Sequence, residues 1–173
     1  PLDANQSFVP KIISTKDSGI IVRGGGSSGE YKQCLHTCIN LNRSADATAE
    51  WLKSQKLEPK NCQIINALPL HHVSGLLPWW RSRCWMAQHM WLHPQLINDP
   101  QKLEKECNSL IYAHKGPLLT SLVPTQLIRL IKHPAGIRWL QMFSIIWVGG
   151  AAIPENVLTT SRKLKLRLAP CYG

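Results

Sequence analysis

Short apolar runs rich in β-branched residues alternate along the chain with longer segments in which apolar residues recur every three or four positions. The short runs are typical of strands and the longer segments of amphipathic helices. Gly and Pro separate them at fairly even intervals, and no internal repeat or low-complexity linker intervenes. The alternation predicts an α/β fold, with a mixed, largely parallel sheet flanked by helices and functional residues at the strand ends.

The expected strands lie at 19–23, 33–37, 62–70, 118–123 and 144–148. The expected helices lie at 45–52, 75–93 and 102–114, with two more that begin at Pro124 and Pro154. Ser44 is predicted as the N-cap of the first helix. The basic run 162–167 alternates with leucines and is predicted as the solvated face of a strand.

Composition excludes a disordered chain, because 44% of the 173 residues are apolar and only 17% are charged. The net charge is +10, and most of the excess lies after residue 100. Such a field favours anionic partners, which include phosphates, acidic metabolites, nucleic acid and membrane lipid.

Six irregularly spaced cysteines and the lack of a secretory leader at residue 1 favour a reducing, cytoplasmic setting with free thiols. No apolar run approaches the roughly 20 residues that cross a bilayer, so no stable membrane insertion is expected. The chain does not begin with Met, and we therefore expect it to be an excerpt of a longer protein.

The strongest chemical signal is the run Gly24-Gly25-Gly26-Ser27-Ser28-Gly29 directly after a predicted strand. Its small residues leave backbone N–H groups free to converge on an anion, and Lys32 adds a positive charge nearby. A hairpin tip without a ligand is an equally ordinary interpretation of a glycine run.

Three classes of phosphate loop compete for this segment. The Walker form needs Lys after its last Gly, and Glu30 stands there instead. The dinucleotide fingerprint needs a helix to begin in the loop and an acidic residue at the next strand end, whereas 30–34 is poor helix sequence and Glu50 falls inside a predicted helix. The third class is a Ser/Gly hairpin closed by Lys, in which hydroxyls bind phosphate oxygens and the Lys neutralises departing pyrophosphate.

This third form resembles the loop of adenylate-forming enzymes, the superfamily of acyl- and aryl-CoA synthetases, luciferases and peptide-synthetase adenylation domains. Their loop reads Thr-Ser-Gly-Ser/Thr-Thr-Gly-x-Pro-Lys-Gly, against Gly24 to Gln33 here. The central Gly-Ser-Ser-Gly and the Lys are kept, whereas the leading hydroxyl pair, the Pro and the final Gly are not. The resemblance implies a catalytic Lys32 and an ATP phosphate site formed by Gly26, Ser27, Ser28, Gly29 and Lys32.

Two further segments resemble motifs of the same superfamily in the same order. Leu68 to Gly75 is similar to its Pro-Leu-x-His-x-x-Gly segment, which implies a catalytic His72 and an acyl pocket bordered by His72, Ser74 and Gly75. The alternative is that His72 only caps the helix that follows. Near the end, 146–154 and 168–173 are similar to the segments of the adenine site, which implies contacts from Gly149, Gly150, Ala151, Tyr172 and Gly173, with the Tyr ring stacked on adenine.

The resemblance covers the chain from about residue 17 to its end, and within the superfamily the phrases at 68–75, 122–127, 147–152 and 166–173 are similar to o-succinylbenzoate-CoA ligases of menaquinone and phylloquinone biosynthesis. It implies small-molecule substrates: ATP, the acid, which forms an acyl-adenylate, and CoA, which then displaces AMP. It also implies that residues 1–173 are a single partial domain, the AMP-binding N-terminal region of such an enzyme. The Mg²⁺ ligand and the C-terminal domain are expected beyond residue 173, with no metal ligand within the chain.

Other features have simpler interpretations. Cys34-x-His36-x-Cys38 lacks a second ligand pair at zinc-site spacing. Trp79, Trp80, Trp85 and Trp91 are expected in the core and at an interface rather than in base stacking or membrane contact. Two alternatives to the ligase stay open, a basic nucleic-acid-binding module and a noncatalytic remnant that binds a partner; for the ligase we expect no nucleic-acid partner, and a homodimer is compatible with the sequence.

Overall fold

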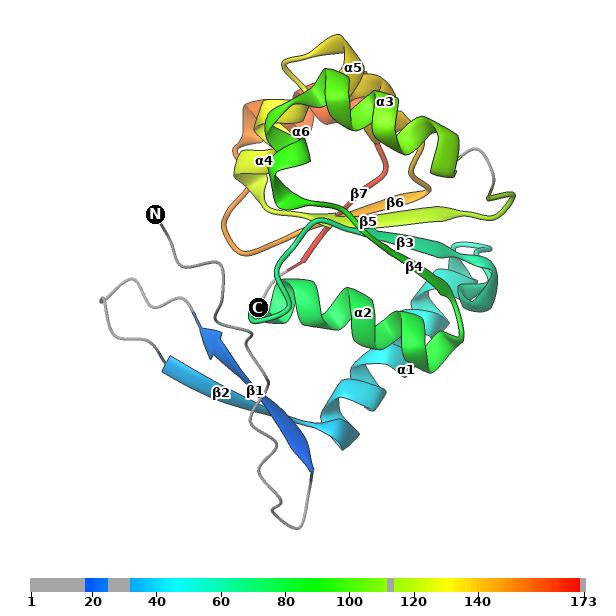
Figure 1. The fold of residues 1–173 in the computed structure, drawn as a ribbon, viewed down its shortest axis with the longest axis vertical. Helices are drawn as coiled ribbons and strands as arrows, with labels where there is room; N and C mark the ends of the chain where they lie inside the picture. The colour runs from blue at the N-terminus through cyan, green and yellow to red at the C-terminus, as the bar shows by residue number, and fades with distance from the viewer. Residues whose placement is uncertain (1–17, 25–31, 112–113, 172–173) are drawn as a thin grey trace.

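Five parallel strands form the central sheet in the computed structural model, which describes residues 18–24, 32–111 and 114–171 (Figure 1). The strand order is β4-β3-β5-β6-β7, and every neighbouring pair is parallel. The strands are β3 (Gln63–Asn66), β4 (Gln88–Trp91), β5 (Leu118–Leu122), β6 (Ile145–Val148) and β7 (Leu168–Pro170). The predicted α/β fold with a largely parallel sheet is confirmed.

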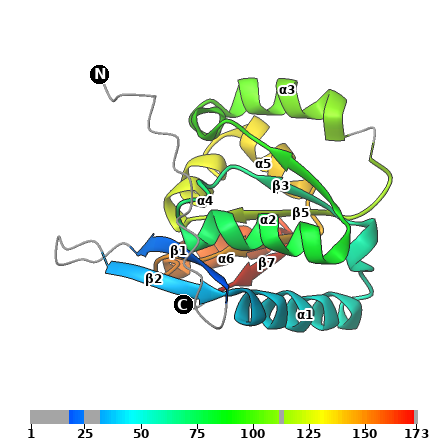
Figure 2. The ribbon, with the colours of Figure 1, turned by 60° about the horizontal axis from the view of Figure 1, so that its bottom comes forward.

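Helices cover both faces of the sheet (Figures 1 and 2). One face carries α1 (Cys38–Ser54) and α2 (Val73–Trp85). The other carries α3 (Pro100–Ile111), α4 (Pro124–Leu130), α5 (Pro134–Gln141) and α6 (Glu155–Lys163). Two short 3₁₀ turns, η1 (Pro59–Asn61) and η2 (Pro94–Asn98), precede β3 and α3.

The three inner strands β3, β5 and β6 are buried on both faces, and most of their residues are apolar. Successive side chains point to opposite faces, so Ile64 packs with Leu52 of α1 and Trp85 of α2, whereas Ile65 belongs to the larger cluster beneath α3 to α6. On β6, Ile145 and Trp147 belong to the same cluster as Ile64, on the side of α1 and α2. Ile146 and Val148 point to the other face and belong to the cluster of Ile65. The two layers of helices therefore pack on two separate cores.

A two-stranded hairpin stands apart from the sheet. β1 (Gly19–Gly24) pairs antiparallel with β2 (Lys32–Thr37), from Gly19 opposite Thr37 to Gly24 opposite Lys32. Val22 packs against Leu41 of α1 and Leu76 of α2. Direct antiparallel pairing excludes the dinucleotide fingerprint, which needs a helix and then a parallel strand after the loop. Residues 25–31 themselves lie outside the described part of the chain.

The predicted helix at 75–93 is wrong in its second half. α2 ends at Trp85 because Met86 adopts the left-handed conformation, with φ 54°. The Ala87 N–H donates to Ser82 O at 2.9 Å and the Met86 N–H to Arg83 O at 3.4 Å, the paired bonds of a Schellman stop. The chain then enters edge strand β4, whose apolar residues had continued the helical spacing in the sequence.

Three other boundaries are also corrected. The N-cap of α1 is Thr37, whose Oγ1 accepts from the Asn40 N–H at 3.2 Å, so Ser44 lies inside the helix. The strand expected at 62–70 ends at Asn66, because the chain turns at Pro69. The basic run 162–167 is not a strand: it comprises the end of α6 and a turn at Lys165, where φ is 57°.

The tryptophans of α2 belong mainly to the core, as expected. Trp85 is buried and its Nε1 donates to Ala45 O at 3.1 Å. Trp79 and Trp80 are partly buried beside Leu76, and Trp80 Nε1 donates to Asn42 Oδ1 at 2.9 Å. Trp91, on edge strand β4, is exposed.

All six cysteines are free thiols. Cys62 and Cys107 lie in the core, where burial raises the pKa of each thiol to about 11. Among the residues that the structure describes, no helix is long and apolar enough to cross a membrane.

Met86→Gly should stabilise the chain. Gly adopts positive φ without steric cost, and the 86% exposed Met86 side chain contributes little packing. We expect the free energy of unfolding to rise by about 1 kcal/mol. Met86→Ala is the matched control, because it removes the side chain and keeps the Cβ strain. Equal urea midpoints for the Gly and Ala variants would contradict this account of the helix stop.

Candidate functional site

The carboxyl ends of β3, β5, β6 and β7 meet at one edge of the sheet, because all four strands run in the same direction. The segments that follow them are 67–72, 123–124, 149–154 and Cys171. Three of the four resemble motifs shared by adenylate-forming enzymes, and the fourth lies within the phrase at 122–127 that is similar to o-succinylbenzoate-CoA ligases. The fold therefore brings these distant segments to one edge, where α/β proteins bind their ligands.

His72 lies in the turn that connects β3 to α2. Its N–H donates to Pro69 O at 3.2 Å, and its carbonyl accepts from the Leu76 N–H at 3.0 Å. His72 occupies the N-cap position, but its side chain makes no capping hydrogen bond. The ring instead lies 4.4 Å from that of His71. The interpretation of His72 as a simple helix cap therefore lacks the bond that defines a cap.

Gly75 closes this turn by direct contact of backbone with backbone. A Cβ at this position would lie 2.3 Å from Pro69 O and 2.5 Å from Leu68 O. Only Gly permits that approach, and Ser74 lies beside it in the first turn of α2. The three residues predicted for the acyl pocket, His72, Ser74 and Gly75, thus form one tight turn.

Gly149 and Gly150 follow β6 and lie between the ends of β5 and β7. The Gly149 N–H donates to Leu122 O at 3.2 Å, and a Cβ on Gly149 would lie 3.2 Å from the Cβ of Cys171. Gly150 has φ +88°, which favours Gly, and lies beside Val123. Ala151 follows as an exposed residue. The Cys171 N–H donates to Val148 O at 2.8 Å, so this turn packs against the end of β7.

The phosphate-loop prediction falls only partly within the described residues. Lys32 is the first residue of β2, and its backbone pairs with Gly24 at the end of β1. These two residues close the hairpin around the predicted loop. Gly26, Ser27, Ser28 and Gly29, and also Tyr172 and Gly173 of the predicted adenine site, lie outside the described residues.

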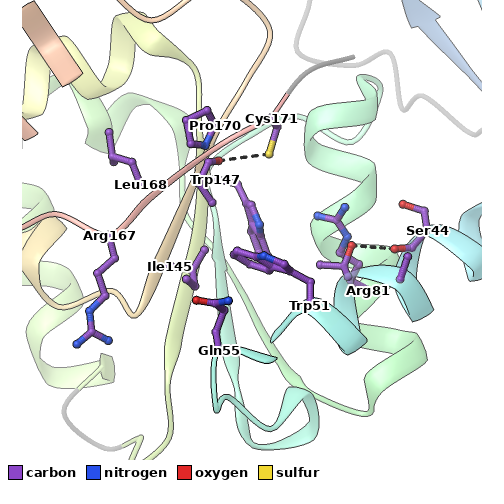
Figure 3. Close-up of a pocket in the computed structure, with 13 residues that line it drawn as sticks. Ser44, Trp51, Gln55, Arg81, Ile145, Trp147, Arg167, Leu168, Pro170 and Cys171 are labelled. Atoms are coloured by element: carbon purple, nitrogen blue, oxygen red, sulfur yellow. Dashed lines mark hydrogen bonds between the residues drawn. The ribbon is translucent and has the colours of Figure 1, made fainter. Parts of the chain in front are cut away.

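An open cavity of about 740 Å³ lies between α1, α2 and the strands β6 and β7 (Figure 3). Trp51 of α1, Arg81 of α2 and Trp147 of β6 supply its large side chains. The cavity reaches the carboxyl edge at Cys171, next to the Gly149 turn. None of the described residues predicted for the site lines it, so the cavity is an addition to the site that the sequence predicted.

Two arginines line this cavity, and Arg81 is partly buried whereas Arg167 is exposed. The guanidinium carbon of Arg81 lies 5.1 Å from the centre of the Trp147 ring, within cation–π range. Its Nε is buried and has no hydrogen-bond partner among the residues that the structure describes. Burial lowers the pKa of the Arg81 guanidinium, although an arginine remains charged at neutral pH. A half-buried cation without an acidic partner can bind an anion.

Arg81 was not among the site residues predicted from the sequence. The available signal was its spacing, because Arg81 is four residues from both Leu77 and Trp85, which pack against the core. An arginine on the apolar side of a helix needs either an acidic partner or a ligand.

No group of three or more His, Cys, Asp or Glu side chains that could hold a metal ion occurs within residues 18–24, 32–111 and 114–171. Cys34, His36 and Cys38 all lie in this part of the chain.

No protein-family model matches the chain, and no curated protein matches it in sequence. Solved structures do match it in fold. O-succinylbenzoate coenzyme A synthetase (MenE) from Bacillus subtilis, in complex with AMP, has a TM-score of 0.69 and 22% sequence identity over 88% of this chain. The same enzyme matches in its complexes with ATP and a magnesium ion and with the acyl-adenylate OSB-AMP.

Two proteins from other organisms match as well. The N-terminal domain of FACL13 from Mycobacterium tuberculosis matches 91% of this chain, with a TM-score of 0.65 and 18% identity. ATP-bound MatB from Rhodopseudomonas palustris matches 88%, with a TM-score of 0.62 and 20% identity. The chain covers 29%, 37% and 28% of the Bacillus, Mycobacterium and Rhodopseudomonas chains, respectively. Its fold is therefore that of part of the N-terminal domain of adenylate-forming enzymes, as the motifs predicted.

His89 of β4 lies behind the His72 turn, with its Nε2 3.4 Å from Asn66 Nδ2 and its ring 4.4 Å from that of Trp91. Burial lowers the pKa of the His89 imidazole from 6.5 to about 4, so the ring is neutral in the folded protein at pH 7.

Stability should therefore fall as the pH is lowered from 6.5 to about 4, because the unfolded chain binds a proton that folded His89 does not. The loss in the free energy of unfolding should stay below about 1.4 kcal/mol per pH unit, which is the limit for a fully desolvated ring, since His89 keeps some contact with solvent. Urea unfolding of wild type and His89→Gln across this range isolates the effect. Curves whose difference does not change with pH would contradict it.

Proposed function

We propose that this chain forms the acid- and nucleotide-binding part of an ATP-dependent acid–CoA ligase. The observation that carries the proposal is that three segments share one edge of the sheet. They are the Gly149–Gly150 turn, the end of β7 and the His72 turn. In chain order, the His72 turn resembles the acyl motif of adenylate-forming enzymes, and the Gly149–Gly150 turn and the end of β7 resemble their adenine motifs. The fold shared with CoA ligases supports the same assignment.

In the proposed reaction, a carboxylate oxygen of the acid attacks the α-phosphorus of ATP and displaces pyrophosphate. The sulfur of CoA then attacks the acyl carbon, and AMP leaves. Ser27, Ser28 and the N–H groups of Gly26 and Gly29 would bind the phosphates, and Lys32 would neutralise the charge that develops on pyrophosphate. Magnesium would enter with ATP as part of that substrate.

The adenine would lie against Gly149, Gly150 and Ala151, with Tyr172 and Gly173 on its other side. The tightness of the Gly149 turn supports this placement, because a backbone without side chains lets a flat base approach closely. His72 would border the reacting carboxylate, with Ser74 and Gly75 at the wall of the acyl pocket.

We propose o-succinylbenzoate as the acid, which places the protein in menaquinone or phylloquinone biosynthesis in the cytoplasm. The phrases at 68–75, 122–127, 147–152 and 166–173 are similar to ligases for this substrate, and its B. subtilis synthetase shares the fold. The acid carries two carboxylates and an aromatic ring. Arg81 would pair with the carboxylate that does not react, and Trp147 would pack against the ring.

The proposal predicts pyrophosphate exchange into ATP in the full-length protein, dependent on o-succinylbenzoate. Lys32→Ala should lower the exchange rate by about a hundredfold, because it removes charge stabilisation at the leaving pyrophosphate. Lys60→Ala, on the exposed turn η1, is the control and should leave the rate unchanged. Absence of acid-dependent exchange in wild type would reject the ligase. Salt-sensitive binding to generic DNA or RNA without a response to ATP would then favour the nucleic-acid module. If the protein bound no nucleic acid either, the noncatalytic remnant would be favoured.

The assignment of Arg81 has its own test. Arg81→Gln should raise the KM for o-succinylbenzoate by about tenfold to a hundredfold, the cost of one charge-assisted bond. The KM for benzoylpropionate, which lacks the ring carboxylate, should change little. Arg83→Gln is the matched control, since Arg83 is exposed on the same helix. Equal effects of Arg81→Gln on both acids would show that Arg81 does not bind the second carboxylate.

A further inference from the structure

Asn66 is the last residue of β3, and its side chain is fully buried. Its Oδ1 accepts from the Leu68 N–H at 3.0 Å, and its Nδ2 donates to Gly75 O at 2.9 Å. One amide therefore joins the first part of the His72 turn to its last residue. The same Nδ2 lies 3.4 Å from His89 Nε2 on the neighbouring strand β4.

Both hydrogens of the Asn66 Nδ2 group have an acceptor in this arrangement. One hydrogen of Nδ2 bonds the turn, and the other bonds His89, whose neutral ring accepts at Nε2 when Nδ1 carries the proton. Asp at position 66 would accept from Leu68 but could not donate to Gly75, and Ser would be too short to reach both. The buried position therefore requires the chemistry of Asn.

The turn that Asn66 holds has little other freedom. Gly75 packs directly on the carbonyls of Leu68 and Pro69, and the His72 N–H is bonded to Pro69 O. A shift of Leu68 relative to Gly75 would therefore move His72 as well. Buried hydrogen bonds that span a turn fix its geometry because leaving either partner unpaired is costly.

We propose that Asn66 is a positioning residue, which holds the turn from Leu68 to Gly75 in one conformation and thereby sets the place of His72 at the sheet edge. His89 completes the arrangement by fixing the orientation of the Asn66 amide. The consequence for catalysis rests on the proposed function: the turn borders the acid and not the triphosphate. Loss of Asn66 affects use of the acid more than use of ATP.

The experiment compares wild type, Asn66→Ala and the matched control Thr120→Val in the full-length protein. Thr120 is equally buried on neighbouring β5, and its Oγ1 donates to Ile65 O at 2.8 Å rather than to a residue of the turn. Hydrogen exchange of the Leu68, His72 and Gly75 amides should accelerate by about tenfold or more in Asn66→Ala. Thr120→Val should leave these amides as in wild type.

Kinetics test the consequence. In Asn66→Ala, kcat/KM for o-succinylbenzoate should fall by about tenfold to a hundredfold, the typical effect of a misplaced catalytic segment, while the KM for ATP stays near that of wild type. Equal losses for acid and ATP, or unchanged exchange at the turn, would overturn the proposal. If wild type activates no acid, the ligase proposal fails, and hydrogen exchange alone then decides the role of Asn66.

A second pair of variants serves if Asn66→Ala does not fold. His89→Leu removes the acceptor behind Asn66, whereas the amide oxygen of His89→Gln can replace it. The Leu variant should accelerate exchange at the same amides by about threefold, and the Gln variant should restore slow exchange. Identical exchange at the turn in both variants would contradict the role given to His89.

Discussion

Parallel pairing of β3, β5, β6 and β7 determines both the layers of the fold and the position of the candidate site. It forces each strand to return through a helix, which supplies the two layers that bury both faces of the sheet. It also brings the carboxyl ends of all four strands to one edge. The His72 turn and the Gly149 turn are far apart in sequence and share that edge because their strands are both neighbours of β5.

Elements with a strong local signal were predictable from the sequence. β5 and β6 are short, fully buried and bounded by turn residues, and α4 begins at Pro124 as predicted. The predicted helix at 75–93 was wrong in its second half because Met86 adopts a left-handed conformation, for which methionine has no preference. β4 is an edge strand with half-exposed residues, so its pattern could not be told from the last turns of a helix. Ser44 failed as a cap because Thr37 caps an earlier start.

The site divides in the same way. His72, Gly75, Gly149 and Gly150 were predicted from sequence motifs. The structure explains Gly75 by its close approach to neighbouring backbone and Gly150 by its positive φ. Asn66 and Arg81 were not predictable, because their roles depend on contacts across the fold: Asn66 with Gly75 and His89, and Arg81 with Trp147. The net charge of +10 had suggested anionic partners in general, and Arg81 gives that suggestion one specific position beside an open cavity.

We propose that the acid and the nucleotide bind together at the carboxyl edge of the sheet. The most direct measurement is the hydrogen-exchange footprint of a non-hydrolysable sulfamoyl analogue of the o-succinylbenzoyl adenylate on the full-length protein. We expect slower exchange at 72–75, at 149–151 and in α2 around Arg81, with no change in α5 or α6. Protection confined to the layer of α3 to α6, or no protection at saturating analogue, would contradict it.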